Sequence, residues 1–253
     1  MVGKDCDRSP AVGVHLHTEN RSELLRPETF GINIKEALIM KKLLALLLVL
    51  ALSVPALAEE EVINLPAPVK TGGLPLMEAI NLRKSLSSFQ DTELTDKDLA
   101  TLLWAAGGVN RDDGKLVYPS AMDTRDLVIY AFTKAGVCRY NPENHTLTVI
   151  EKGDYRPYAA VQPFGAKAAV NLVYVQDSSR WPKGFRGTPE QIKQAGFSHA
   201  GFSMQNVYLY AASQGWGAHC VMSMNYEKLP EILGLTETQS LILAICVGPL
   251  TQE

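Results

Sequence analysis

The chain has 253 residues, with 24 Lys and Arg against 27 Asp and Glu, and a formal net charge of −3. This balance gives no excess of positive charge for binding nucleic acid. The four cysteines show no spacing typical of a metal site. The length excludes a chain of many domains and suits one domain preceded by an N-terminal extension.

The segment that begins at Met40 has the three parts of a secretory signal. Two lysines come first, an unbroken apolar run fills 43–52, and 56–58 is an A-x-A cleavage site. The apolar stretch is shorter than the roughly 20 residues that span a bilayer. The sequence therefore predicts a signal peptide from Met40 to Ala58 and export, with the bacterial periplasm as the expected location. A buried core helix is the alternative.

The flanking segments carry little regular pattern. Residues 1–39 have no sustained helical or alternating apolar period, so we expect an upstream leader that precedes a true start at Met40. Residues 59–73 are rich in Pro, Gly and charge, which predicts an extended arm or tether. The folded domain is expected over 74–253.

Helices and strands mix in this domain without a βαβ rhythm, which predicts an α+β fold. One helix is expected to be capped by Thr95, with Asp98 three residues on, and to end at Gly107-Gly108. The remaining predicted elements are, in chain order, a helix over 74–83, a strand over 126–134, a hairpin over 137–154, a buried strand over 168–177, a helix over 190–213 and a last strand over 240–248.

Common catalytic patterns are absent from the sequence. It contains no dinucleotide-binding or phosphate-binding glycine loop and no nucleophile elbow. His145 is expected in a hairpin turn, facing solvent. His219 and Cys220 form a weak candidate pair, because adjacent strand residues point to opposite faces.

One polar group at a helix end is more informative. Arg83, Lys84, Ser85, Ser87 and Ser88 put two cations and three hydroxyls together, a set that can hold a phosphate. A solvated helix C-terminus is the alternative, since cations are favourable there in any case.

Five motifs in order carry a family resemblance: "RKSLSSF", the helix "LLWAAGGVNR", "YPSAMDTRDLVIYAF", "AGFSMQNVYLYAASQGWGAHCV" and "ILAICVGP". From about Leu76 to Pro249 the chain resembles the nitroreductase-like FMN flavoproteins. Within them it is most similar to the dehydrogenases that oxidise thiazoline and oxazoline rings.

The resemblance implies an α+β fold that binds FMN at the interface of a homodimer. It implies an oxidoreductase acting on a small molecule, with hydride or electrons passing through FMN. No catalytic side chain is expected, because the cofactor supplies the chemistry. The implied cofactor-binding residues are Arg83, Lys84 and Ser85 at the phosphate and ribityl chain, with Ser87 beside them; Pro119, Ser120 and Ala121 beside the ring; and the turn and strand that contain Gly215, Gly217, Val221 and Met222. Gln205 and Asn206 are implied packing and dimer contacts.

The chain departs from the family pattern in three places. Ser87 stands where a basic residue is usual, no Lys or Arg follows "VGPLTQE", and "MDTRD" follows the P-S-A segment. Arg125 is a candidate replacement cation or an exposed ion-pair residue. A catalytically degenerate protein that uses the same fold to bind a ligand or partner therefore stays open. For an exported enzyme, we expect a redox partner other than NADH or NADPH.

Overall fold

A computed structural model describes residue 31, residues 33–52 and residues 60–252. The chain divides into two units, 1–58 and 59–253. In the first, helix α1 (Ile34–Leu52) begins upstream of Met40, so the end of the predicted leader and the apolar run share one helix. The predicted cleavage site at 56–58 lies outside the described residues. Within the described ranges, no helix has both the length and the apolar character to cross a membrane.

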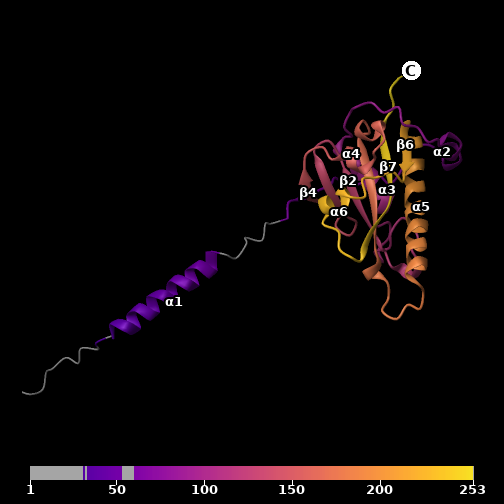
Figure 1. Cartoon of the computed structure of the whole chain (residues 1–253). Helices are drawn as coiled ribbons and strands as arrows, with labels where there is room; N and C mark the ends of the chain where they lie inside the picture. Colours follow the sequence, from indigo (N-terminus) through magenta and orange to yellow (C-terminus); the bar gives the residue numbers. More distant parts are fainter. Residues whose placement is uncertain (1–30, 32, 53–59, 253) are drawn as a thin grey trace, which may run out of the picture. The chain divides into compact units, whose positions relative to one another are not determined.

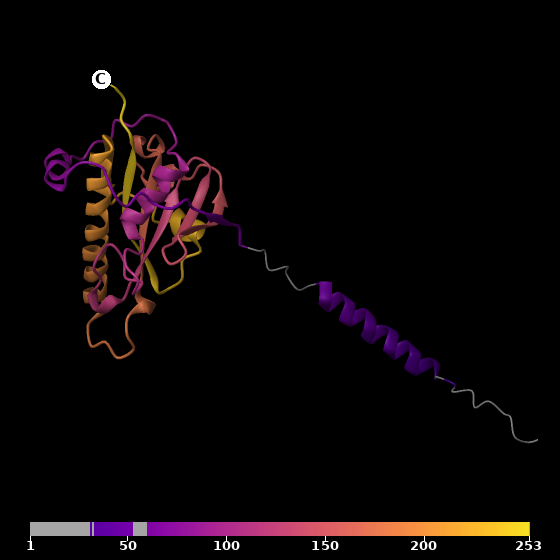
Figure 2. The ribbon, with the colours of Figure 1, turned by 180° about the vertical axis from the view of Figure 1, so that it is seen from behind.

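The second unit is built on one seven-stranded sheet with strand order β1-β4-β3-β2-β5-β7-β6. Every neighbouring pair is antiparallel. The sheet and its flanking helices confirm the α+β prediction (Figures 1 and 2). The strands are β1 (Val62–Asn64), β2 (Leu127–Phe132), β3 (Gly136–Asn141), β4 (Thr146–Lys152), β5 (Val170–Asp177), β6 (Trp216–Val221) and β7 (Gln239–Pro249).

Helices cover both faces of the sheet, and alternate strand residues point to opposite faces. Ile129 packs in the core under the long helices α3 and α5, whereas Tyr130 packs in the second core with Leu229 of α6. The predicted central strand, β5, is buried along nearly its whole length. The helices of this unit are α2 (Leu76–Leu82), α3 (Asp96–Gly107), α4 (Arg156–Ala159), α5 (Pro189–Ser213) and α6 (Lys228–Leu233), with single 3₁₀ turns at Ala121–Asp123, Pro163–Ala166 and Ser178–Arg180.

Side-chain caps fix where the two main helices begin. The Thr95 hydroxyl accepts the Asp98 N–H at the start of α3, as predicted. Thr188 and Gln191 form a reciprocal capping box at the start of α5, with Pro189 in the first turn. Both helices therefore start at positions that the local sequence specifies.

Three residues of the predicted arm form part of the sheet. Val62–Asn64 pairs with β4 as the edge strand β1. The Leu65 N–H donates to the His145 carbonyl at 3.4 Å, and the His145 ring nitrogen Nε2 lies 3.1 Å from the Pro66 carbonyl. His145 is half-buried, so its predicted solvent-facing position is wrong. Its backbone carbonyl and its ring instead connect Leu65 and Pro66, respectively, to the hairpin turn.

Candidate functional site

The polar segment that follows α2 runs beside strand β6 and the end of β7. The Leu86 N–H donates to the Ala218 carbonyl at 3.0 Å, and the Gln90 N–H to the Pro249 carbonyl at 2.9 Å. In the opposite direction, the Thr251 N–H donates to the Ser88 carbonyl at 2.8 Å. These backbone bonds hold residues 86–90, which directly follow Arg83, Lys84 and Ser85, against the sheet.

Tyr208 of α5 joins this segment to β6. The Arg83 guanidinium carbon lies 5.4 Å from the centroid of the Tyr208 ring, within range of a cation–π contact. The Tyr208 hydroxyl lies 3.2 Å from Ser85 Oγ and accepts the Cys220 N–H at 2.8 Å. Cys220 directly precedes Val221 and Met222. The fold thus brings two of the predicted segments, 83–87 and 217–222, to one place.

The cations of this cluster keep their hydrogen-bond donors available. Among the described residues, no carboxylate lies within ion-pair distance of Arg83 or Lys84. Lys84 and Ser85 are exposed, while Arg83 and Ser87 are half-buried. Two unpaired cations beside two hydroxyls match the donor set that a phosphate requires.

The glycines near this cluster have a packing role. A Cβ on Gly217 would lie 3.0 Å from the Leu86 carbonyl oxygen, so the close approach of segment and strand requires glycine. Gly215 has φ +69°, a left-handed conformation that favours glycine in the turn before β6. Val221 is buried and Met222 is exposed. Contact of these residues with a flavin stays a prediction.

The predicted Pro119–Ala121 segment leads into a strained turn. Three residues without the freedom of glycine have positive φ: Met122 at 52°, Asp123 at 54° and Arg125 at 47°. For Met and Arg this left-handed conformation is uncommon and costs about 1–2 kcal/mol each. The Arg125 guanidinium donates to both oxygens of Asp123, at 3.1 and 2.9 Å. Arg125 therefore forms a local ion pair.

A buried hydrogen-bond chain holds this turn in place. The Ala121 N–H donates to His199 Nε2 at 2.8 Å, so the His199 proton is on Nδ1. His199 Nδ1 in turn donates to Asp126 Oδ1 at 2.7 Å. The second Asp126 oxygen accepts Gln176 Nε2 at 2.8 Å and Trp181 Nε1 at 2.9 Å.

Asp126 is fully buried and its charge is fully compensated by donors. Burial alone raises the pKa of a carboxyl group, but the hydrogen bonds from His199, Gln176 and Trp181 outweigh it and hold the Asp126 pKa below its ordinary value. The carboxylate is therefore ionised at neutral pH. It fixes the orientation of the His199 ring, which fixes the Ala121 backbone.

The two parts of the predicted site contact opposite flanks of α5. His199 and Tyr208 are nine residues apart in this helix, which is two and a half turns and about 13 Å along its axis. Ala121 is hydrogen-bonded to His199, and Ser85 is hydrogen-bonded to Tyr208. One copy of the chain therefore does not bring segments 83–87 and 119–121 together. Asn206, between these two positions, donates to the Val117 carbonyl at 3.3 Å, a packing role as implied, and Gln205 is exposed.

Tyr208, His199 and Asp126 were not predicted as site residues. Asp126 is separated from its His199 partner by 73 positions, so no local spacing connects them. The one signal available in the sequence was a polar residue next to apolar or small ones. Asp126 directly precedes a buried apolar strand, and His199 lies among small residues of a long helix.

Residues 80–249 match the sequence model of the nitroreductase family. The chain belongs to the nitroreductase family. A protein of Methanocaldococcus jannaschii that is named as a nitroreductase is 31% identical in an alignment of 193 positions, which covers 68% of this chain and 93% of that protein. The similarity to thiazoline and oxazoline dehydrogenases has no counterpart in these matches.

Solved structures of family members share the fold. A Ralstonia eutropha protein named as a nitroreductase is 35% identical, with a TM-score of 0.70 over 79% of this chain and 94% of its own. The NADPH:FMN oxidoreductase of Vibrio harveyi, solved with NAD⁺, is 20% identical, with a TM-score of 0.53 over 70% of this chain and 69% of its own. At that identity the second likeness shows the fold alone.

Proposed function

We propose that this nitroreductase-family chain is an exported oxidoreductase that binds FMN and acts on a small molecule. The observation that carries the proposal is the cluster of Arg83, Lys84 and Ser85, whose donors are free and whose place is fixed against β6 and Tyr208. A terminal phosphate is the group that such a donor set suits best. FMN ends in a phosphate, and the name of the Vibrio harveyi neighbour includes FMN.

When bound, FMN supplies hydride and electron transfer, so the protein has to bind and orient it. Arg83 and Lys84 hold the phosphate, and Ser85 donates to the phosphate or ribityl chain. The Ala121 backbone, fixed by His199, forms a rigid wall beside the ring. The absence of acid–base pairs among the predicted residues fits this division of labour.

A homodimer would complete the site. The side chains of α2 are unusually exposed for an apolar helix, and α2 stands off the body beside α5 (Figures 1 and 2). Exposed apolar patches of this kind mark protein interfaces. We propose that a second copy covers α2 and places its own 119–121 segment opposite Arg83 of the first. The exposed side chains are Leu76, Met77, Ile80 and Leu82.

Flavin uptake tests the function directly. The purified protein should be yellow, or should bind added FMN with quenching of flavin fluorescence, at concentrations up to the order of tens of micromolar. Sedimentation of the loaded protein should give twice the mass of one chain. No uptake would favour the second candidate, a degenerate member that binds a ligand or partner without turnover. The observation behind that candidate is Ser87, where the family usually has a cation.

Export would change the electron donor. Free NADH and NADPH are not expected outside the inner membrane, so we propose that another reductant or acceptor serves the exported enzyme. Cell fractionation with N-terminal sequencing tests export, and a mature start at Glu59 is expected. Rapid-mixing reduction of the FMN-loaded protein compares NADH with a reduced quinol. Saturable fast reduction by NADH, or uncleaved protein in the cytoplasm, would contradict the proposal.

A further inference from the structure

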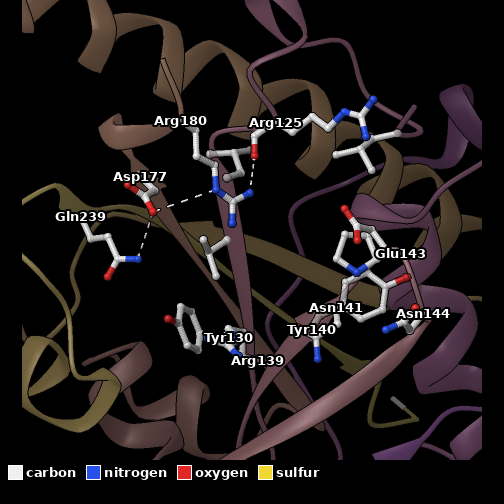
Figure 3. A pocket seen from close by; sticks show the side chains of 14 residues that line it. Arg125, Tyr130, Arg139, Tyr140, Asn141, Glu143, Asn144, Asp177, Arg180 and Gln239 are labelled. Atoms are coloured by element: carbon white, nitrogen blue, oxygen red, sulfur yellow. Dashed lines mark hydrogen bonds and ion pairs between the residues drawn. The ribbon is translucent and has the colours of Figure 1, made fainter. Parts of the chain in front are cut away.

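A polar cavity lies at the end of the sheet where β2 and β3 separate, and it shares only Arg125 with the candidate functional site described above. The two strands pair only between 130–132 and 137–139. The start of β2, before Tyr130, and the end of β3, after Arg139, are not paired with each other. Their separated ends leave a cavity of about 420 Å³ (Figure 3). That volume is within the range of small-molecule pockets.

Arginines from three separate elements line this cavity. Arg125 comes from the turn before β2, Arg139 from β3 and Arg180 from the turn after β5 (Figure 3). Arg180 donates to the Arg125 carbonyl, which fixes the orientation of its guanidinium. Arginine offers a planar fork of donors that suits carboxylate and phosphate groups.

Two of these arginines are loosely paired. Arg139 Nη2 lies 3.6 Å from the exposed Glu60 carboxylate, and Arg180 Nε lies 4.0 Å from Asp177. Asp177 already accepts hydrogen bonds from Ser179, Thr238 and Gln239. Both arginines therefore keep donors that an incoming anion can use. The Arg125 guanidinium is paired with Asp123, so this residue lines the cavity without being available to an anion. Glu143, at the rim, carries the opposing charge.

The Tyr130 hydroxyl is a further donor in this cavity. The Tyr130 residue is 3% exposed and lines the cavity, and its hydroxyl forms none of the side-chain hydrogen bonds found within the described residues. Burial raises the pKa of Tyr130, so the hydroxyl keeps its proton at neutral pH. The hydroxyl is not among the buried polar atoms that lack a partner, so it is open to the cavity and can donate to an anion there. The neighbouring Tyr140 differs, because its hydroxyl is bonded to His145.

We infer that this cavity binds a small oxyanion, such as a carboxylate or phosphate group, through Arg139, Arg180 and the Tyr130 hydroxyl. The anion would displace the long ion pairs and accept the free Tyr130 proton. This site is independent of the proposed flavin function.

Calorimetric titration of the full chain tests the inference. The probes are succinate and inorganic phosphate, with 1,4-butanediol as the neutral counterpart of succinate. One saturable site is expected for at least one of the anions, with affinity at or below millimolar, and none for the diol. Arg139→Gln and Arg180→Gln should each weaken binding about tenfold or more, and Tyr130→Phe severalfold. Arg186→Gln, at an exposed arginine outside the cavity, should leave binding unchanged.

Each other outcome overturns the inference. No binding of either anion, equal binding of the diol, or unchanged binding in Arg139→Gln would do so. Loss in Arg83→Ala with retention in Arg139→Gln would assign the anion to the proposed flavin-phosphate cluster instead. Circular dichroism and thermal unfolding of each variant show that it is folded. Arg139 is partly exposed, so its substitution leaves a usable test even if Tyr130→Phe does not fold.

Discussion

The two ends of the predicted flavin site are built in opposite ways. At the Tyr208 end, exposed Lys84 and Ser85 leave donors free, and ordinary sheet-like backbone bonds hold the segment. At the His199 end, Ala121 is held by a fully buried, fully bonded Asp126–His199 pair, and the turn itself is strained. At the first end, hydrogen-bond donors are available to a ligand, whereas at the second end the polar groups are bonded to other groups of the protein.

This contrast implies that ligand affinity and folding stability depend on different residues. Substitutions at the Tyr208 end should change ligand affinity with little effect on folding. Substitutions at the His199 end should change stability first, since buried groups would lose their partners. The following predictions test that separation.

The largest effect is expected at Asp126. Asp126→Ala removes the acceptor of three buried donors, from His199, Gln176 and Trp181. The free energy of unfolding should fall by about 3 kcal/mol. Urea unfolding measures it, with exposed Asp112→Ala as the control, expected within about 0.5 kcal/mol of the wild type. Equal effects of the two substitutions would remove the basis for the comparison.

Arg83→Ala should act on ligand binding alone. Loss of a charge-assisted hydrogen bond should weaken FMN binding by about 1.5–3 kcal/mol. Riboflavin, which lacks the phosphate, should lose much less, and urea unfolding of the flavin-free protein should be nearly unchanged. Fluorescence titration with both flavins measures this, with exposed Arg186→Ala as a control. Equal losses for the two flavins would place Arg83 outside the phosphate site.

Acid should destabilise the His199 end through Asp126. Because the folded-state pKa is depressed, the stabilisation is present above the unfolded Asp pKa of about 3.9 and is lost as pH falls through the folded value. The unfolding free energy of the wild type should therefore decline between about pH 5 and pH 2. Asp126→Asn should show a shallower decline, because the amide side chain does not titrate in that range. Parallel curves for the two proteins would refute the assignment.

The smallest effect is expected from relief of strain. Met122→Gly removes a left-handed side-chain clash worth about 1–2 kcal/mol and adds about 0.5–1 kcal/mol of backbone entropy loss. The free energy of unfolding should rise by about 0–1.5 kcal/mol. Met222→Gly is the matched control, because Met222 is also exposed but has no positive φ, and should lower stability. A loss in both variants would mean that the turn is not strained.

Local signals predicted most of the fold. The Thr95 cap, the Gly107-Gly108 end of α3 and the apolar run of β5 are all encoded within a few neighbouring residues, and each is confirmed. The start of α1 at Ile34 and the pairing of Val62–Asn64 with β4 were not predicted. Three exposed residues carry no strand pattern of their own, so their structure depends on a partner far along the chain.

The site was predictable only where its residues are adjacent in sequence. Arg83, Lys84 and Ser85 could be seen as a phosphate-binding group because they are consecutive. Tyr208 and the His199–Asp126 pair were missed, because contacts between distant segments form only in the folded chain. The family motifs located segments, but they did not show that α5 keeps two of them apart.

The short strand β1 has a consequence for aggregation. The seven-residue strand β4 would otherwise be the sheet edge, and long unpaired edges recruit strands from other chains. β1 covers it with only three residues, and Glu60 and Glu61 just before it pair with Arg139 and Lys152. A short edge flanked by charges is a poor template for further pairing. Trimming the chain past Asn64 would therefore uncover β4 and lower solubility, even though every residue of the proposed flavin site would remain.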